Sequence, residues 1–329
     1  MNILIPDTIF DDDHAIEHNA AAPCSVAIRR ATGSDDLSAE DWAGADALVA
    51  HHLMPYGAAI VERAVNARIL VRVGVGVDNI DLPVWAEKGI PVCNIPDYGT
   101  GEVADHALAL VLSLLRGLAD YQDRLAYLGD EAFDRLPLPG TMRRAAGLNC
   151  LVVGFGQTGR AFAARAAAPG MNIGVFTRGS AAAAEVPPYR RFDVLDDGLA
   201  WADIVSLHLP LTPDTVDLID ADRLAAMKPD ALLVNTARGG LVNTAAVVDA
   251  LQAGRLGGVG LDVFRDEPLA ATDILATGVR TRADWARGRV VLTPHVGGVS
   301  PQALVELRRR SVEAARDYLV DGIIRHRVA

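Results

Sequence analysis

The sequence predicts an α/β fold in which two parallel β-sheets are each covered by helices. Short apolar runs alternate with helical patterns along the whole chain, as expected when helices connect parallel strands. The chain has 329 residues, which is long for one domain and suits two. Hydrophobic residues make up 50% of it and charged residues 22%, as in ordinary globular proteins.

The first hundred residues carry strand candidates separated by helix-like segments such as AAIVERAVNA. Their spacing predicts a doubly wound parallel sheet, and residues 1–100 are expected to form one α/β domain of the flavodoxin-like kind. The strand candidates read NILIP, SVAIRR, ALVAHH, ILVRVG and PVCNIP.

A long amphipathic run follows and predicts a single helix over residues 101–127. Further strand candidates then predict a second doubly wound sheet, of the Rossmann kind, within residues 101–297. A last helical run after Pro301 has no strand left to pair with there. Residues 298–329 are therefore expected to return to the first domain, which becomes discontinuous. The candidates of the second sheet are NCLVVGFG, NIGVFTR, DIVSLHLP, ALLVNTA, GGVGLDV and RVVLTPH.

The acidic composition limits the classes of partner. A net charge of −11 and a pI near 5.1 argue against nucleic acid or an anionic membrane and favour a small-molecule protein. No stretch approaches the ~20 apolar residues of a membrane helix, and no secretory signal is visible, so we expect a cytoplasmic protein. Cys24, Cys93 and Cys150 are odd in number and far apart, which predicts free thiols and no metal knuckle.

The segment LVVGFGQTGRAF at residues 151–162 places glycines directly after a strand candidate and before a helical one. Gly154 permits a tight turn, Gly156 lets a pyrophosphate approach the backbone, and Gly159 lets the helix pack on the sheet. The first N–H groups of the helix would hold the phosphates. The motif predicts a dinucleotide-binding domain. The other predicted contacts in this loop are Phe155, Gln157 and Thr158.

The next strand candidate ends in NIGVFTRGS, at the place where an acid would indicate that the ribose 2′-hydroxyl is read. Thr177 stands there instead, and Arg178 and Ser180 follow. A carboxylate would repel a 2′-phosphate, whereas a guanidinium and hydroxyls bind it through charge-assisted hydrogen bonds. The sequence therefore favours NADP(H) as cofactor. NAD(H) is the alternative, in which Thr177 is permissive and Arg178 stacks on adenine.

Three polar residues end late strand candidates, at the edge where open α/β sheets place ligands. Arg238 lies in ALLVNTARGG, Glu267 lies in GVGLDVFRDEP, and His295 ends RVVLTPH. With the glycine loop, the phrases NTARGGLVN, GLDVFRDEPL and TPHVGG resemble the D-isomer-specific 2-hydroxyacid dehydrogenase family. The phrases VRVGVGVDNIDLP and GIPVCNIPDYGTGEVADHALAL are similar to it too, especially to members related to the C-terminal-binding-protein corepressors. The resemblance covers essentially the whole chain.

This resemblance implies an enzyme that reduces a small 2-oxo acid to the D-2-hydroxy acid. Arg238 would grip the substrate carboxylate with its planar fork. His295 would give a proton to the keto oxygen as hydride arrives, and Glu267 would fix its tautomer and favour the imidazolium. Backbone N–H groups at Val75 and Gly76 would add donors to the carboxylate.

The same resemblance assigns dinucleotide binding to residues 101–297 and substrate binding to the discontinuous domain. Family members usually dimerise, so a homodimer is expected. Asp262 would lie near the nicotinamide carboxamide, or equally cap the next turn. The remaining cofactor contacts that it implies are Thr100, His208, Leu209, Pro210, Thr215, Thr236, Ala237 and Gly297.

Several alternatives stay open. The rival functions are a dinucleotide-sensing, corepressor-like binding protein and a D-3-phosphoglycerate dehydrogenase, and the residues do not single out one 2-oxo acid. The connection at 268–294 is longer than the family usually has, and it forms either a wall or lid at the active site or a surface excursion.

Other histidines have competing explanations. His14, Glu17 and His18 match an inverted zinc-protease pattern, but a solvated helix start explains them and no metal is expected. His51 ends the third strand candidate and is a candidate substrate contact. His106 lies within the long helix, where a role in the core is expected.

Overall fold

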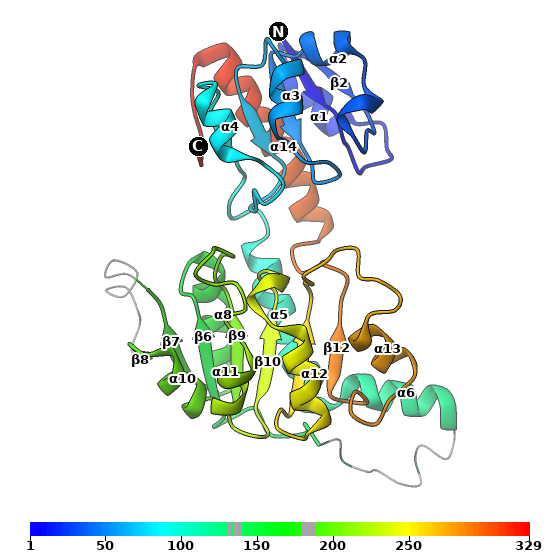
Figure 1. Cartoon of the computed structure of the whole chain (residues 1–329), viewed down its shortest axis with the longest axis vertical. Coiled ribbons are helices and arrows are strands. Elements are labelled where there is room, and N and C mark those ends of the chain that lie inside the picture. The colour runs from blue at the N-terminus through cyan, green and yellow to red at the C-terminus, as the bar shows by residue number, and fades with distance from the viewer. Residues whose placement is uncertain (130–132, 134–137, 139, 179–188) are drawn as a thin grey trace. The chain divides into compact units, whose positions relative to one another are not determined.

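The computed structural model describes residues 1–129, 133, 138, 140–178 and 189–329 (Figure 1). These residues form two compact units. The first unit comprises Met1–Gly99 with Ser300–Ala329, and the second unit comprises Thr100–Val299. Each contains one parallel sheet with helices on both faces, which confirms the predicted fold class.

The sheet of the first unit has five parallel strands in the order β2-β1-β3-β4-β5. Its central strands are apolar on both faces, as expected for a parallel sheet covered on both sides. All five strand candidates of the sequence are present. The strands are β1 (Asn2–Ile5), β2 (Ser25–Ile28), β3 (Ala47–Ala50), β4 (Leu70–Arg72) and β5 (Val92–Cys93).

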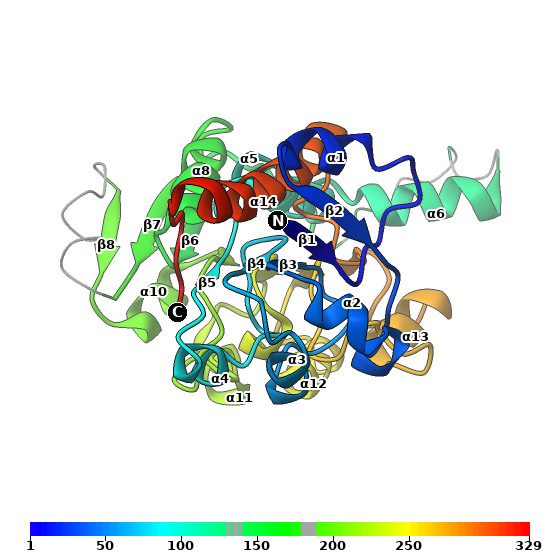
Figure 2. The same ribbon diagram turned by 90° about the horizontal axis from the view of Figure 1, so that it is seen from above.

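Two helical layers cover this sheet, as Figure 2 shows. Helices α1 and α14 pack on one face, and α2, α3 and α4 bury Trp42, Ile60 and Trp85 on the other. The helices of this unit are α1 (Ala15–Ala21), the 3₁₀ turn η1 (Ser34–Asp36), α2 (Ala39–Ala43), α3 (Ala58–Arg63), α4 (Leu82–Glu87) and α14 (Pro301–Asp321).

A buried ion pair holds α14 against α1. The Arg308 guanidinium donates to both carboxylate oxygens of Glu17, at 2.5 and 2.7 Å, and to Asp12 at 2.6 and 2.8 Å. Arg308 and Glu17 are 6% and 3% exposed, so each charge depends on the other. The acid of the zinc-protease pattern therefore has a structural partner, and His14 lies before α1 at its N-cap.

The second unit has seven parallel strands in the order β12-β11-β10-β9-β6-β7-β8. The sequence predicted six and missed β8, which is short, lies at the sheet edge and begins with two arginines, so no apolar run marks it. The strands are β6 (Asn149–Val153), β7 (Asn172–Phe176), β8 (Arg190–Phe192), β9 (Ile204–Leu207), β10 (Leu232–Asn235), β11 (Gly258–Leu261) and β12 (Val290–Leu292).

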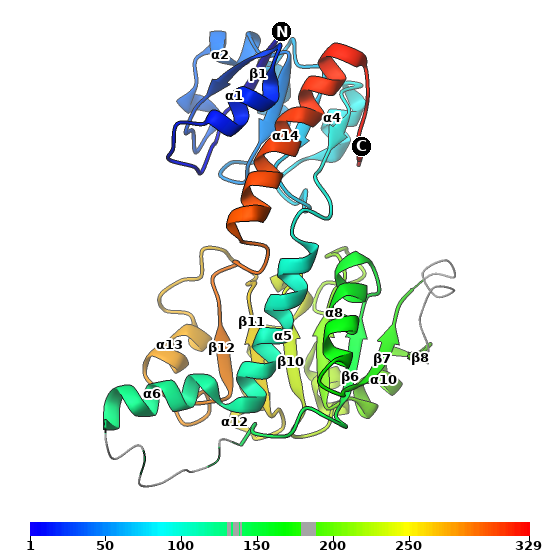
Figure 3. The ribbon, with the colours of Figure 1, turned by 180° about the vertical axis from the view of Figure 1, so that it is seen from behind.

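Helices α5 and α8 cover one face of this sheet, as Figure 3 shows, and α10, α11, α12 and α13 cover the other. None of the described helices combines the length and apolarity that a membrane crossing needs. The helices are α5 (Thr100–Arg116), α6 (Leu118–Leu128), α8 (Gln157–Ala167), α10 (Leu195–Trp201), α11 (Ala221–Ala226), the 3₁₀ turn η2 (Gly239–Leu241), α12 (Thr244–Gln252) and α13 (Ile274–Arg280).

The single long helix predicted over 101–127 is wrong. Gly117 adopts the left-handed conformation, with φ 62°, and divides the segment into α5 and α6. Glycine takes this conformation without the penalty that a Cβ imposes. Amphipathic spacing continues through the break, so periodicity alone did not reveal it.

The connection at 268–294 packs on the second unit. It contains α13, and a Cβ added at Gly278 would come within 2.5 Å of the Trp285 ring, which lies against the core. Arg282 lies over the ring of Tyr127 on α6, 4.1 Å from its centroid, and its Nε is 3.7 Å from Asp123. The connection therefore packs against the core through Trp285 and against α6 through Arg282.

Candidate active site

The glycine loop joins the end of β6 to the start of α8. Gly154 has φ 95°, and a Cβ there would lie 2.3 Å from the carbonyl oxygen of His208. A Cβ at Gly159 would lie 2.1 Å from the Gly154 oxygen, so both positions require glycine. At Gly156, by contrast, a Cβ would meet nothing within 4 Å. The loop is thus tight on its protein side and open at the N-terminus of α8, which fits a dinucleotide pyrophosphate.

Two buried polar atoms at the same edge of the sheet lack partners among the described residues. They are Nδ1 of His208, after β9, and Oγ1 of Thr236, after β10. Burial lowers the pKa of His208 to about 3, so its ring is neutral, and its Nε2 lies 2.8 Å from Ser206 Oγ. Buried polar atoms are nearly always paired, so these two fit a site completed by a bound molecule.

Other predicted cofactor contacts lie in the loops at this edge. Thr215 uses its hydroxyl inside its own loop, donating to the carbonyl of Pro210 at 2.9 Å and accepting the Thr212 N–H at 2.7 Å. Ala237 donates its N–H to Asn235 Oδ1 at 3.0 Å, which fixes the turn after β10. The Thr215 hydroxyl and the Ala237 N–H are thus engaged within their own loops. Leu209 follows His208, and Thr100 begins α5.

The residues that bear on the cofactor's 2′-position follow β7. Thr177 is partly buried, and the Arg178 side chain is 59% exposed. Nη1 of Arg178 lies 3.9 Å from an Asp214 carboxylate that is 83% exposed. This exposed pair leaves the guanidinium accessible to an anion. Ser180, the other residue predicted here, lies outside the described residues.

His295 and Glu267 meet at the carboxyl edge of the sheet. Nδ1 of His295 lies 2.6 Å from Oε2 of Glu267, and Glu267 Oε1 accepts the N–H of Phe264 at 2.8 Å. The carboxylate can only accept, so Nδ1 carries the proton and Nε2 is the ring atom left for acid–base chemistry. The His295 side chain is 51% exposed, so that atom is reachable from solvent.

Arg238 follows β10, beside the segment that leads to Glu267. Its Nη1 donates to the carbonyl of Ala237 at 2.7 Å, and its own carbonyl accepts from Asn235 Nδ2 at 2.9 Å. A Cβ at the next residue, Gly239, would lie 1.9 Å from the carbonyl carbon of Phe264. The absence of that Cβ lets the Arg238 turn and the Phe264–Glu267 turn pack backbone to backbone.

Asp262 follows β11 and organises the turn that carries His295. Its Oδ1 accepts from Thr293 Oγ1 at 2.6 Å and from the Val296 N–H at 2.9 Å, while Oδ2 accepts the Gly297 N–H at 2.8 Å. Burial by itself raises the pKa of Asp262, but hydrogen bonds from His106, Thr293 and these amides outweigh it and lower the net value. The side-chain contacts of Asp262 are therefore with the turn after β12, and not with the turn that directly follows Asp262 in the chain.

The predicted substrate residues of the first unit lie after β3 and β4. His51 is 3% exposed, burial lowers its pKa to about 3, and its N–H donates to Asp7 Oδ1 at 2.8 Å. Val75 is 53% exposed, and the N–H groups of Val75 and Gly76 donate no hydrogen bond within the described residues. His51 is thus a neutral buried ring, whereas the two amides are available.

Sequence reasoning missed Asp7, a fully buried carboxyl group at the end of β1. It accepts from Tyr56 Oη at 2.6 Å and from the N–H groups of His51 and Leu53 at 2.8 and 3.0 Å. Burial outweighs these bonds and raises the pKa of Asp7 to about 6. The sequence did carry a signal for Asp7, because this carboxyl group directly follows the apolar strand candidate NILIP.

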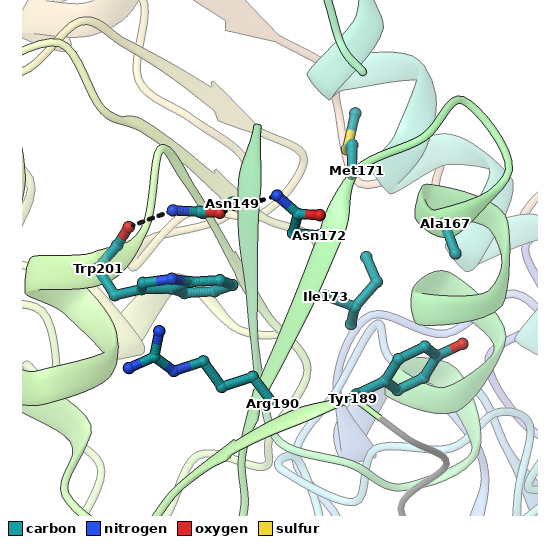
Figure 4. A pocket seen from close by; sticks show the side chains of 8 residues that line it. All are labelled: Asn149, Ala167, Met171, Asn172, Ile173, Tyr189, Arg190 and Trp201. Atoms are coloured by element: carbon teal, nitrogen blue, oxygen red, sulfur yellow. Dashed lines mark hydrogen bonds between the residues drawn. The ribbon is translucent and has the colours of Figure 1, made fainter. Parts of the chain in front are cut away.

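A hollow of about 470 Å³ lies at the opposite end of the second sheet, and Figure 4 shows the side chains that line it. Asn149, Asn172 and Arg190 are the first residues of β6, β7 and β8, so this hollow lies away from the glycine loop and His295. It is therefore not part of the candidate active site. Its lining residues are Asn149, Ala167, Met171, Asn172, Ile173, Tyr189, Arg190 and Trp201.

Comparisons with known proteins agree with this geometry. Residues 108–297 match the family model described as D-isomer specific 2-hydroxyacid dehydrogenase, NAD binding domain. The chain is 34% identical over 300 residues to D-3-phosphoglycerate dehydrogenase of Mycobacterium tuberculosis, covering 91% of this chain and 54% of that protein. It therefore spans about half the length of that curated relative. It is also 35% identical over 261 residues to glyoxylate reductase of Pyrococcus furiosus, covering 78% of this chain and 74% of that protein.

A solved structure resembles the whole chain. It is the NADPH-dependent glyoxylate/hydroxypyruvate reductase of Sinorhizobium meliloti in complex with NADP and malonate, at 27% identity and a TM-score of 0.85. The similarity covers 100% of this chain and 96% of that one. The family match, the sequence identities and the shared fold show that the chain belongs to the D-isomer-specific 2-hydroxyacid dehydrogenase family.

Proposed function

We propose that the chain is an NADP(H)- or NAD(H)-dependent oxidoreductase that reduces a small 2-oxo acid to the D-2-hydroxy acid. The observation that carries the proposal is the 2.6 Å hydrogen bond between His295 and Glu267 at the carboxyl edge of the sheet. It holds the imidazole in one tautomer and leaves Nε2 free to exchange a proton with substrate. The similarity to glyoxylate reductase of Pyrococcus furiosus supports this reaction class.

Three side chains carry the proposed chemistry. Arg238 binds the substrate carboxylate through paired N–H donors, which orients the acid as well as attracting it. His295 gives its Nε2 proton to the keto oxygen in reduction and removes the hydroxyl proton in the reverse direction. Glu267 stabilises the charged imidazolium that precedes the transfer. A bound reduced nicotinamide supplies the hydride.

The cofactor residues follow from the glycine loop. Gly154, Gly156 and Gly159 admit the pyrophosphate to the N-terminus of α8, and Arg178 meets the adenosine 2′-position. Thr177 stands where an acid would repel a 2′-phosphate, and Arg178 follows it with a guanidinium. This combination favours NADP(H) over NAD(H). The NADPH-dependent reductase of similar structure supports this preference. Asp262 and Gly297 are proposed to lie near the nicotinamide.

Residues of the first unit complete the proposal for the substrate. Val75 and Gly76 offer backbone N–H groups to the carboxylate, and His51 contributes a neutral ring at the end of β3. D-3-phosphoglycerate is a second candidate substrate, because the curated M. tuberculosis relative acts on it by name. The domain roles follow from these assignments, with residues 101–297 binding the dinucleotide.

The proposed partner is a second copy of the chain, and the proposed location is the cytoplasm. Apolar side chains exposed on α6 support self-association, since contiguous exposed apolar surface marks contact sites. Leu118, Leu125 and Leu128 lie on one side of the helix by their spacing and are 57%, 53% and 45% exposed. Sedimentation of the purified protein at a dimer mass would support a homodimer, and a monomer mass at micromolar concentration would contradict it.

A spectrophotometric panel tests the activity. The purified protein is mixed with NADPH or NADH and with glyoxylate, hydroxypyruvate, pyruvate or a bulkier 2-oxo acid, and D-3-phosphoglycerate is tested in oxidation. We expect oxidation of the nicotinamide with at least one 2-oxo acid, a D-configured product, and loss of turnover in His295→Ala. Dinucleotide binding with no turnover on any substrate would overturn the dehydrogenase and favour the corepressor-like alternative.

A further inference from the structure

One face of α5 runs along β11. A helix advances ~6 Å over four residues and a strand ~6.6 Å over two, so residues four apart on a helix can follow residues two apart on a strand. A Cβ at Gly258 would lie 3.3 Å from Leu114, and a Cβ at Gly260 would lie 3.1 Å from Leu110. These glycines let the helix lie close to the strand. The next residue of the same helix face is His106, level with the residue that follows β11.

His106 reaches Thr293 and Asp262 at the end of the strand. Its Nε2 lies 2.8 Å from Thr293 Oγ1 and 3.3 Å from Asp262 Oδ1. The Thr293 hydroxyl donates to Asp262 Oδ1 at 2.6 Å, so its oxygen can only accept from His106. Nε2 of His106 therefore carries a proton and directs the Thr293 hydroxyl towards Asp262.

Asp262 in turn holds the turn that carries His295. Its carboxylate accepts the N–H groups of Val296 and Gly297, and its backbone carbonyl accepts the N–H of His295 at 2.7 Å. His295 has φ 54°, in the left-handed region that side chains other than glycine rarely adopt. Such a conformation is strained and persists only where the surroundings enforce it.

A Cβ at Gly297 would lie 2.8 Å from Asp262 Oδ2 and 3.4 Å from His106 Cδ2. The turn is thus closed against both side chains, with no room for a larger residue. Helix α5, β11 and the His295 turn form one hydrogen-bonded assembly inside the second unit.

We propose that His106 is a positioning residue for proton transfer, acting through Thr293 and Asp262 to hold His295 in its strained, catalytically productive conformation. The kinetic part of this inference rests on the proposed function. The structural part, that His106 holds the turn, stands apart from it.

Paired variants distinguish the effect of losing the N–H donor of His106 from the effect of losing its ring. His106→Phe keeps a flat ring and loses the donor, whereas His106→Gln keeps an N–H donor near the position of Nε2. Thr293→Val removes the hydroxyl that joins His106 to Asp262, whereas Thr293→Ser keeps it. His18→Phe, an exposed histidine on α1, controls for the loss of a histidine as such.

Two readouts are measured. Amide hydrogen exchange of Val296 and Gly297, followed by NMR, reports the Asp262 hydrogen bonds without requiring activity. We expect exchange to accelerate by about 10-fold or more in His106→Phe and Thr293→Val, and to stay near wild type in His106→Gln, Thr293→Ser and His18→Phe. In turnover, kcat should fall about 10- to 100-fold in His106→Phe and Thr293→Val and stay near wild type in the other three variants.

The outcomes are distinguishable. Wild-type protein inactive on every substrate refutes the proposed function alone, and exchange still decides whether His106 holds the turn. Unchanged exchange in both donor-removing variants overturns the positioning role. Accelerated exchange with wild-type kcat also overturns it, because the turn would then not need His106 for catalysis. Thr293→Val keeps the test available should His106→Phe fail to fold.

Discussion

Glu267 accepts two hydrogen bonds at once, from Nδ1 of His295 at 2.6 Å and from the Phe264 N–H at 2.8 Å. Each carboxylate oxygen serves one donor, so the residue joins the histidine to the turn after β11. A carboxamide cannot accept from both donors, since one of its two heteroatoms is itself a donor. If its NH2 group faced Nδ1, that nitrogen would have to become the acceptor, which reverses the tautomer of His295.

Glu267→Gln should therefore lower kcat about 10²-fold, and His295→Ala about 10³-fold, because each removes part of the proposed acid–base step. Dinucleotide affinity, measured by nicotinamide fluorescence, should stay within about 3-fold of wild type in both. The rates are measured at saturating 2-oxo acid. A Glu267→Gln enzyme with wild-type kcat would contradict the role given to this carboxylate.

Arg178→Ala tests the cofactor preference. If the exposed guanidinium binds the 2′-phosphate, NADPH should bind about 10- to 100-fold more weakly in the variant, while NADH affinity changes little. Arg191→Ala is the matched control, since Arg191 is also an exposed arginine, on β8, with an aspartate neighbour. Fluorescence titration gives both affinities. Equal binding of NADPH and NADH to the wild type would show that Thr177 and Arg178 are permissive.

Gly239→Ala tests the backbone contact between the turns that carry Arg238 and Glu267. The new Cβ would fall 1.9 Å from the carbonyl carbon of Phe264, so the Arg238 and Glu267 turns must separate. We expect kcat/KM to fall about 100-fold through displacement of these side chains, with the fold retained. Gly140→Ala, where a Cβ meets nothing within 4 Å, is the control and should keep wild-type kinetics. Wild-type kcat/KM in Gly239→Ala would mean that the turns tolerate separation.

Asp7 makes the stability of the first unit depend on pH. Its pKa is raised to about 6 in the folded unit, so the folded state holds the proton more tightly than the unfolded chain. The stabilising contribution is complete below about pH 4 and is lost as the pH rises through about 6, amounting to about 3 kcal/mol at most.

The measurement compares the chain with its Asp7→Asn variant, which cannot ionise there. Urea unfolding is followed in a Trp201→Phe, Trp285→Phe background, where the remaining Trp42 and Trp85 are both fully buried in the first unit. The free energy of unfolding of the Asp7 protein, relative to Asp7→Asn, should decrease between pH 4 and pH 7. A difference independent of pH would show that Asp7 ionises normally.

The sequence by itself determined the two parallel sheets and the residues at their carboxyl ends. Apolar runs of strand length are local signals, and a parallel sheet necessarily brings the ends of its strands to one edge. Gly154, Gly156 and Gly159 were readable as a local motif between a strand and a helix, whereas the contact of Gly154 with the His208 carbonyl could be seen only in the structure. Arg238, Glu267 and His295 could be placed at the sheet edge from the chain order alone.

Only the tertiary structure decided which side chains complete one another across the chain. Arg308 meets Glu17 because α14 returns to the first unit, and the two are 291 positions apart. His106 meets Thr293 because Gly258 and Gly260 let α5 approach β11, a fit between helix and strand spacing that neither segment reveals alone. Contacts of this kind depend on how elements pack against one another, and packing joins residues that local pattern treats as independent.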